Sequence, residues 1–300
     1  MNDLLIIVIN WRREDETISC LKDLFPLRSK NDSVFLIDNQ STTNSKEALL
    51  KHNEFFDYFE SKEKNTGFSG ACNIGIKFAH HNGFNKVLFL NTDAELETDT
   101  IDKMKTELDL YNAALVSPVL HDTISRVPYF CGMKPRLEEL KLEPLTIDNL
   151  SQINTTEKQG LIIHGTVLMG SVQKLTNVGG FDDDFFAYWE DTELCQRLLV
   201  EGYDCRTVSN AIAYHPSSRN KDGNTVRSGY FYYYMARNEI LFWKKCTKGL
   251  KKYKAIYWHI TRSVDLMKEL KSYGHIKESK SIVTGILHGI FSQFGKWKKQ

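Results

Sequence analysis

An acidic cluster, Asn91-Thr92-Asp93-Ala94-Glu95, directly follows the apolar, β-prone run 86–90. A carboxylate at the end of a strand can hold a divalent cation together with phosphate oxygens. Such a cation stabilises the negative charge that collects on a departing phosphate group, without any proton transfer. We therefore interpret Asp93 as a candidate metal ligand. A structural reading is also open, because Thr92-Asp93 can begin a helix or a turn.

A glycine-containing segment, residues 65–73 (NTGFSGACN), has the composition of an anion-binding loop. Gly67 permits close approach of the backbone to a ligand, and the N-terminus of the helix that follows favours negative charge. The segment lacks the Gly-Lys-Ser/Thr ending of a P-loop, so it does not belong to that class of phosphate site.

Acidic and aromatic residues crowd together in residues 179–191 (GGFDDDFFAYWED). Leu194 and Leu198 then mark an amphipathic helix, which places Glu190 and Asp191 at the helix N-terminus. Asp191 is the candidate general base for an attacking hydroxyl, while the aromatic side chains can stack on the face of a sugar ring. The structural alternative is that both carboxylates cap the helix, where its dipole favours them.

His215 lies in the sequence Tyr214-His215-Pro216, at the end of a strand-like run over residues 210–214. An imidazole in this position can complete a metal shell or orient a phosphate group. A histidine with a purely structural hydrogen bond explains the local sequence equally well.

The elements that position these residues alternate between strands and helices. Apolar runs predict strands over 4–9, 33–37, 86–90 and 114–118, and helical spacing predicts helices over 17–25, 69–81 and 100–111. This alternation is typical of an α/β, doubly wound, mostly parallel sheet. Ligands of such sheets bind beyond the carboxyl ends of the strands, which is where Asn10, Asp38 and Asp93 fall.

The chain has 300 residues, enough for one large α/β domain and an appendage, and its charge is uneven along the sequence. Residues 244–300 carry 14 Lys and Arg against 3 Asp and Glu, whereas residues 1–243 carry 25 against 35. Residues 119–160 lack periodicity before the apolar run 161–163, and no linker divides the body. We expect one acidic body over 1–243 and a basic, amphipathic helical tail over 244–300.

The basic tail favours an anionic partner. Its lysines alternate with Tyr257, Trp258, Ile260 and Leu266, as in helices that lie in the headgroup layer of a membrane surface. Nucleic acid is the less favoured partner, since the body is acidic and no nucleic-acid-binding motif accompanies the charge. The alternative is a pair of solvated helices packed on the body.

The sequence favours a cytoplasmic protein. It begins Met-Asn-Asp without a basic segment, and the apolar run 4–9 is too short for a signal peptide or a membrane span. Its six cysteines lie far apart without a Cys-x-x-Cys pair, which favours reduced thiols: Cys20, Cys72, Cys131, Cys195, Cys205 and Cys246. We expect attachment, at most, to the inner face of the cell membrane.

Seven short motifs occur in the order found in glycosyltransferase family 2, and the chain resembles its rhamnosyltransferase-like and galactofuranosyltransferase-like members. The motifs are Asn10, Asp38-Asn39-Gln40-Ser41, Asn65-Thr66-Gly67-Phe68, Asn91-Thr92-Asp93, Gly179-Gly180-Phe181-Asp182, Trp189-Glu190-Asp191 and Tyr214-His215. The resemblance implies the GT-A fold, a Rossmann-like, mostly parallel sheet with flanking helices. It also implies a nucleotide-binding half over about 1–118 and an acceptor-binding half over about 119–243.

The resemblance implies roles for individual residues. The donor-side set is Asn10, Asp38, Asn65, Gly67, Asn73, Asn91 and Thr92, with Asp38 near the base or ribose. Asp93 and His215 are expected to hold Mg²⁺ or Mn²⁺, and Asp191 to deprotonate the acceptor in a single displacement with inversion. Glu190 and Trp189 are expected to contact the acceptor. Asn91 departs from the family's frequent Asp-x-Asp motif, and an amide is a weaker metal ligand than a carboxylate.

The implied function is an inverting, metal-dependent glycosyltransferase of cell-surface polysaccharide synthesis. It moves a sugar, with rhamnose favoured, from a dTDP- or UDP-linked donor to a glycan or lipid-linked acceptor. The alternative is a catalytically silent nucleotide-sugar-binding subunit of a membrane-surface complex, which Asn91 favours; nucleotidyl transfer is a third reading. A glycosyltransferase releases nucleoside diphosphate, a silent binding subunit only gains thermal stability from nucleotide, and a nucleotidyl transferase releases pyrophosphate.

Overall fold

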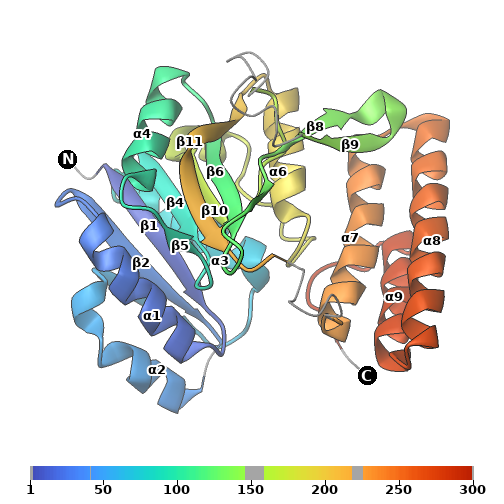
Figure 1. The fold of residues 1–300 in the computed structure, drawn as a ribbon, viewed down its shortest axis with the longest axis horizontal. Coiled ribbons are helices and arrows are strands. Elements are labelled where there is room, and N and C mark those ends of the chain that lie inside the picture. Colours follow the sequence, from blue (N-terminus) through green and yellow to red (C-terminus); the bar gives the residue numbers. More distant parts are fainter. Residues whose placement is uncertain (1–2, 41, 146–158, 218–225, 299–300) are drawn as a thin grey trace.

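The computed structural model describes residues 3–40, 42–145, 159–217 and 226–298. Ser41 of the second sequence motif and residues 146–158 of the segment expected to be irregular lie outside the described residues. The described chain forms an α/β body and, beside it, a separate group of helices (Figure 1).

A nine-stranded sheet forms the centre of the described part of the body, and eight of its strands follow one another in the order β3-β2-β1-β4-β10-β6-β11-β5. Their bounds are Tyr58–Lys62 (β3), Asp32–Asn39 (β2), Leu4–Asn10 (β1), Lys86–Leu90 (β4), Val167–Ser171 (β10), Leu115–Asp122 (β6), Cys205–His215 (β11) and Glu95–Leu96 (β5). The ninth, β7 (Pro128–Phe130), pairs with β6. Pairing is parallel from β3 to β4, whereas β10 runs antiparallel to both of its neighbours. The expected α/β fold is confirmed. The sheet contains more antiparallel pairs than expected, at β10 and between β11 and β5.

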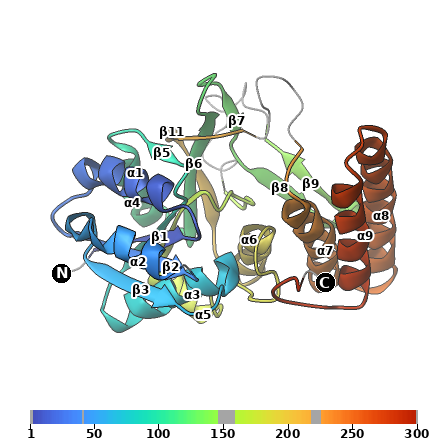
Figure 2. The ribbon, with the colours of Figure 1, turned by 90° about the horizontal axis from the view of Figure 1, so that it is seen from below.

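Helices cover both faces of this sheet (Figures 1 and 2). They are α1 (Glu14–Leu24), α2 (Thr43–Leu50), α3 (Gly67–His81), α4 (Thr100–Leu110), α5 (Val172–Asn177) and α6 (Glu190–Val200), with 3-10 turns η1 (Phe25–Leu27), η2 (Asn53–Phe55) and η3 (Leu137–Glu139). Alternate residues of β1 serve the two faces, since Leu4 and Ile6 pack in the core with α1 and α4 while Leu5 and Ile7 pack with α3. Burial on both faces explains why β1 is a continuous apolar run.

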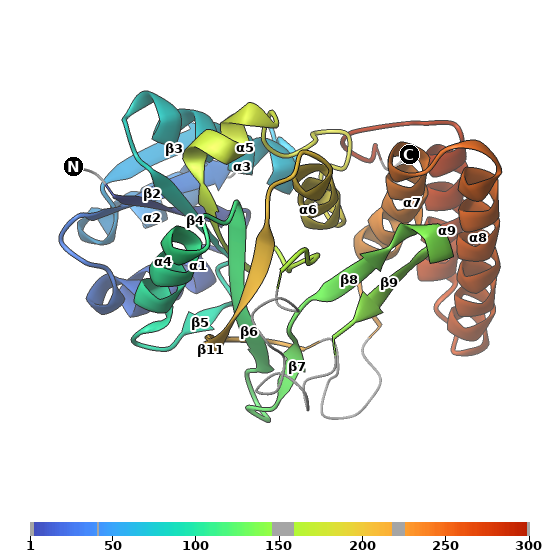
Figure 3. The same ribbon diagram turned by 90° about the horizontal axis from the view of Figure 1, so that it is seen from above.

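The segment expected to be irregular contains more structure than its sequence suggests. β8 (Met133–Arg136) and β9 (Lys141–Pro144) form a separate two-stranded sheet that extends towards the helical group (Figure 3). Both strands are short and largely polar, so neither shows an apolar period. Residues 161–163, in contrast, are buried but form only a single bridge, between Ile162 and Met133.

Three helices form the group beside the body: α7 (Gly229–Cys246), α8 (Gly249–Ser272) and α9 (Ile276–Ile290). The expected helical extension is confirmed, but α7 runs across residue 243, where the sequence placed the boundary. α9 lies close to α7 because Gly285 and Gly289 face its backbone, where a Cβ atom on Gly289 would lie 2.9 Å from the carbonyl oxygen of Arg237. No helix in the described residues is both long and apolar enough to span a bilayer.

An ion-pair cluster joins α7 to α8. The carboxylate of Glu239 lies 2.9 Å from Nδ1 of His259 and also pairs with Arg262. Burial acts to raise the pKa of Glu239, but His259 and Arg262 outweigh it and hold the pKa below its ordinary value of 4.5. The charged carboxylate of Glu239 therefore stabilises the helical group.

Candidate active site

Strand pairing brings Asp93 and His215 together. β5 pairs antiparallel with β11, with Glu95 opposite Tyr214, so the residues next to this pair meet at the same edge of the sheet. Nε2 of His215 lies 3.5 Å from Oδ1 of Asp93. Burial acts to raise the pKa of Asp93, but the hydrogen bond and charge of His215 outweigh it, and the pKa lies below its ordinary value. The carboxylate is thus held in its charged form.

The other ring nitrogen of His215 is occupied by Tyr129. The hydroxyl of Tyr129, on β7, lies 2.8 Å from Nδ1 of His215. A partner at Nδ1 fixes the ring orientation and leaves Nε2 directed at Asp93. Burial raises the pKa of Tyr129, so its phenol stays protonated. Tyr129 therefore orients the imidazole without adding charge.

The atoms of this pair fit one divalent cation. A carboxylate oxygen and an imidazole nitrogen 3.5 Å apart can both lie about 2.1 Å from the same ion. Within the described residues no group of three or more His, Cys, Asp or Glu side chains is placed to hold a metal. A cation bound by Asp93 and His215 would therefore take its remaining ligands from elsewhere, as a diphosphate and water can supply them.

His164 connects this pair to Asp191. Its ring centroid lies 6.2 Å from that of His215, and the backbone N–H of the next residue, Gly165, donates to Oδ2 of Asp191 at 2.7 Å. Burial lowers the pKa of His164, while the nearby charges of Asp191 and Asp93 act to raise it. Asp93 and Asp191 thus lie within electrostatic reach of one imidazole, in a single site.

Three hydrogen bonds hold the carboxylate of Asp191. Besides Gly165, the backbone N–H of Thr192 donates to Oδ1 at 2.6 Å, and its hydroxyl lies 3.2 Å from the same oxygen. α6 begins at Glu190, so the expected position of both acids in its first turn is confirmed. These donors hold the carboxylate in a fixed orientation.

The loop that precedes Asp191 is fastened to α7. Nδ2 of Asn238 lies 2.9, 2.8 and 2.6 Å from the carbonyl oxygens of Phe185, Ala187 and Tyr188, and Nη2 of Arg237 donates to Phe185 at 2.7 Å. Both α7 side chains are fully buried. The helical group thus fixes the backbone that carries Trp189, Glu190 and Asp191.

This loop also has an unusual backbone. Phe186, Tyr188 and Trp189 have φ angles of 65°, 67° and 70°, a region in which non-glycine residues cost about 1 kcal/mol or more each. Such a conformation persists only where the surroundings enforce it. The carbonyl contacts of Arg237 and Asn238 supply that constraint.

Glu190 is buried beside Asp191. Its Oε2 atom has no hydrogen-bond partner in the parts of the chain that the structure describes, and its residue is 7% exposed. Burial, and then the charge of Asp191, raise the pKa of Glu190 well above its ordinary value. Both effects favour the protonated form of this carboxyl group.

The aromatic residue that faces outward is Tyr188 and not Trp189. The ring of Trp189 packs against Phe242 of α7, with ring centroids 5.3 Å apart. Tyr188 is 37% exposed, and Arg13, Arg227 and Asp93 all influence its pKa, which burial raises. Its ring is thus an exposed aromatic surface close to Glu190 in the sequence.

Two expected donor-side residues lie inside the protein. Nδ2 of Asn10 donates to Oδ1 of Asp38 at 3.0 Å, and Oδ1 of Asn10 accepts from the hydroxyl of Thr17 at 2.8 Å. Asn10 and Asp38 are both fully buried. They join the ends of β1 and β2 to α1, and their direct contact with a nucleotide stays a prediction.

The start of α3 is held by Asn39 and Asn65. Oδ1 of Asn65 accepts from the backbone N–H of Gly67 at 2.7 Å, and Nδ2 of Asn39 donates to the carbonyl of Gly67 at 2.9 Å. Gly67 has a φ of 80°, and a Cβ atom there would collide with Phe186. The glycine therefore allows α3 to touch the loop before Asp191.

The remaining donor-side residues make contacts within the protein. Nδ2 of Asn73 donates to the carbonyl of Phe181 at 2.8 Å, so it fastens α3 to the Gly-Gly-Phe-Asp motif. The hydroxyl of Thr92 donates to Glu16 at 2.6 Å. The backbone N–H of Asn91 donates to Thr166 at 3.0 Å, and its side chain is partly exposed.

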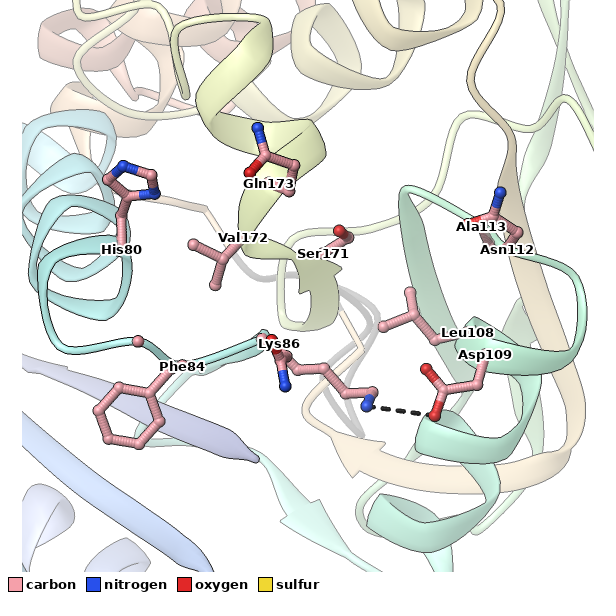
Figure 4. A pocket seen from close by; sticks show the side chains of 12 residues that line it. His80, Phe84, Lys86, Leu108, Asp109, Asn112, Ala113, Ser171, Val172 and Gln173 are labelled. Atoms are coloured by element: carbon pink, nitrogen blue, oxygen red, sulfur yellow. Dashed lines mark ion pairs between the residues drawn. The ribbon is translucent and has the colours of Figure 1, made fainter. Parts of the chain in front are cut away.

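His164, Tyr129 and Arg13 were not expected as members of this site. Each is a single residue in a segment without a motif, and contacts between distant segments bring them there. A cavity of about 400 Å³ lies elsewhere, at the start of β4, and is lined by His80, Lys86 and Asp109 among others (Figure 4). In it Lys86 pairs with Asp109 at 3.1 Å, and none of the predicted site residues lines it.

Comparisons with known proteins identify the family of the chain. The sequence model described as Glycosyl transferase family 2 matches residues 5–160. The chain is 23% identical to the low-salt glycan biosynthesis hexosyltransferase Agl10 of Haloferax volcanii over 99% of this chain and 94% of that protein. It is 24% identical to the dTDP-rhamnosyl transferase RfbF of Shigella flexneri over 67% of this chain and 64% of that protein.

Solved structures share the fold at low sequence identity. The mannosyltransferase PcManGT from Pyrobaculum calidifontis, solved with GDP-Man and Mn²⁺, is 13% identical with a TM-score of 0.60, over 97% of this chain and 87% of that one. GalNAc-T7, solved with UDP, GalNAc and Mn²⁺, is 13% identical with a TM-score of 0.58, over 72% of this chain and 44% of that one. The fold is therefore GT-A, and the protein belongs to glycosyl transferase family 2.

Proposed function

We propose that this protein is an inverting glycosyltransferase that moves a sugar from a nucleoside diphosphate to an acceptor hydroxyl. The observation that carries the proposal is the connected set Asp93, His215, His164 and Asp191, which unites a cation-binding pair with a fixed carboxylate. An in-line displacement needs these two functions on opposite sides of one sugar.

Asp93 and His215 are the proposed ligands of Mg²⁺ or Mn²⁺. The bound cation supplies charge stabilisation for the departing diphosphate. Tyr129 keeps the ring of His215 in place, and Asn91 offers a neutral oxygen at the end of β4. Arg13, which influences the pKa of Asp93, adds a positive charge on the same side. The Mn²⁺ present with the structural neighbours supports this assignment.

Asp191 is the proposed general base. In a single displacement its carboxylate accepts the proton of the acceptor hydroxyl while the oxygen of that hydroxyl forms the new bond to the sugar. The hydrogen bonds from Gly165 and Thr192 keep the carboxylate in one orientation during this transfer. A displacement of this kind inverts the configuration at the sugar carbon.

The acceptor is proposed to bind beside Tyr188. Its exposed ring can stack on a sugar face, the role expected for the aromatic residues of 179–191. Within the described residues Oε2 of Glu190 has no hydrogen-bond partner, so a polar group of the acceptor that reaches this buried position could bind there. We therefore propose Glu190 and Trp189 as residues that shape the acceptor side.

The donor is proposed to be a dTDP- or UDP-sugar, with dTDP-rhamnose favoured. The support is the likeness to the dTDP-rhamnosyl transferase of Shigella flexneri. Asn10, Asp38, Asn65, Gly67, Asn73 and Thr92 are proposed to form or support the nucleotide side. The acceptor is proposed to be a glycan or a lipid-linked glycan of cell-surface polysaccharide, made on the cytoplasmic face of the membrane.

The division of the chain is likewise a proposal. It places the donor half in about 1–118, the acceptor half in about 119–243 and the basic extension in 244–300. The contacts of Arg237 and Asn238 with the loop before Asp191 indicate that the extension, through α7, also serves the acceptor half.

The test is product release from a panel of dTDP-, UDP- and GDP-sugars, with Mn²⁺ or Mg²⁺ and a glycan acceptor. We expect release of nucleoside diphosphate. We also expect the anomeric configuration of the transferred sugar in the product to be opposite to that in the donor. Thermal stabilisation by nucleotide without turnover of any donor would favour the silent binding subunit. Release of pyrophosphate would favour nucleotidyl transfer.

A further inference from the structure

Exposed large apolar side chains are concentrated in the helical group. Of the 21 that the described residues contain, 12 lie between residues 250 and 294. Single exposed apolar residues are common on protein surfaces, but a dense set indicates an interaction site. They are Leu250, Tyr253, Tyr257, Trp258, Leu266, Tyr273, Ile276, Val283, Leu287, Ile290, Phe291 and Phe294.

α9 carries an exposed apolar stripe along its length. Ile276, Val283, Leu287 and Ile290 recur at helical spacing and are 52%, 39%, 47% and 39% exposed. The opposite side of α9 packs on α7, so the stripe is the outer side of the helix. Phe291, 70% exposed, extends the stripe past the end of the helix.

The first turns of α8 carry a second exposed set. Leu250, Tyr253 and Tyr257 are 86%, 65% and 64% exposed, and Trp258 is 42% exposed. Nζ of Lys254 lies 4.7 Å from the centre of the Trp258 ring. Tyrosine and tryptophan beside lysine are typical of the layer between lipid headgroups and acyl chains.

The charge of these helices selects the partner. Residues 244–300 carry 14 basic against 3 acidic side chains, and Lys254, Lys277 and Lys280 are exposed beside the apolar residues. A nucleic acid would match the lysines but would leave the aliphatic stripe in water. A bilayer with anionic headgroups matches both.

We propose that the outer faces of α8 and α9 dock on the surface of an anionic bilayer. The two helices pack on each other at the end of the molecule away from the sheet, so their outer sides are clear of the body (Figures 1 and 2). The proposal specifies the membrane contact within the proposed function. It requires neither a particular donor nor catalysis.

The test is co-sedimentation of the full-length chain with vesicles of phosphatidylcholine alone or enriched in phosphatidylglycerol. The wild type binds the anionic vesicles, and added salt weakens that binding. Val283→Ser with Leu287→Ser on α9, and Tyr253→Ser with Tyr257→Ser on α8, each lower binding by about tenfold, because two apolar contacts are lost.

The matched control replaces two exposed apolar residues of the body, Leu110→Ser and Val200→Ser, which are 69% and 73% exposed. It binds anionic vesicles as the wild type does. The proposal is overturned if either helix variant binds anionic vesicles as strongly as the control does. It is also overturned if a helix variant loses self-association but still binds the vesicles. Sugar transfer to a water-soluble acceptor distinguishes the membrane proposal from the proposed function. The helix variants are expected to keep this activity. Absence of the activity in the wild type would count against the proposed function alone.

Discussion

Replacing Asn238 with alanine tests whether α7 positions the proposed base. The substitution removes the amide that lies 2.9, 2.8 and 2.6 Å from three carbonyl oxygens of the loop before Asp191. A buried acceptor left without its donor costs about 1–3 kcal/mol, so losing both N–H groups costs about 3 kcal/mol in total. The left-handed residues Phe186, Tyr188 and Trp189 then lack part of the constraint that holds them.

Part of this free energy is expected to appear in the rate of reaction. If about half of it reflects displacement of Asp191, kcat falls about tenfold, because 1.4 kcal/mol corresponds to a factor of ten. The KM for the donor is expected to change less than kcat, since of the proposed donor-side segments it is the start of α3 that contacts this loop, at Phe186. Steady-state kinetics and thermal unfolding measure both effects.

The control is Asn82→Ala, which removes an exposed amide that donates to Phe78 at the end of α3. It is expected to leave kcat unchanged. A folded Asn238→Ala variant with the kcat of the wild type would refute the inference that α7 positions Asp191.

Three further predictions concern other parts of the molecule. Charged Glu239 stabilises the fold at pH values above its ordinary pKa of 4.5, and this stability is lost as the pH falls through the lowered pKa of the folded state. Glu239→Gln therefore removes this part of the pH dependence of thermal unfolding. Gly67→Ala places a Cβ atom against Phe186 at a φ of 80°, so we expect a loss of about 1–3 kcal/mol in unfolding free energy and weaker donor binding by calorimetry. His215→Asn raises the Mn²⁺ concentration for half-maximal activity by at least about tenfold, as loss of a metal ligand does, whereas His80→Asn in the remote cavity leaves it unchanged.

The parts of the site that follow regular elements could be predicted from the sequence. Apolar run 86–90 ends at a polar cluster, so Asp93 was expected at the carboxyl edge of a sheet, and β4 ends at Leu90. Leu194 and Leu198 marked a helix with Asp191 in its first turn, where α6 places it. The local pattern was sufficient in both cases: β4 is buried on both faces and is a continuous apolar run, and Leu194 and Leu198 of α6 recur at helical spacing.

The parts that depend on contacts between distant segments could not be predicted. The carbonyl contacts of Asn238 join residues about 50 positions apart, and the hydroxyl of Tyr129 reaches His215 across 86. Trp189 has a φ of 70°, and its ring packs against Phe242 of α7. Backbone conformations of this kind leave no apolar period in the sequence.

The most direct test of the proposed function is the rate of sugar transfer by Asp191→Asn. Asparagine keeps the shape and the contact of one oxygen but cannot accept the acceptor's proton, so we expect the rate of nucleoside diphosphate release to fall by at least about a hundredfold. Nucleotide binding stays near that of the wild type. Some thermal stability is lost, because the amide nitrogen cannot accept from one of the two backbone N–H groups that bind the carboxylate oxygens. Asp102→Asn on the exposed side of α4 keeps full activity. A folded Asp191→Asn variant that transfers sugar at the wild-type rate would contradict the account.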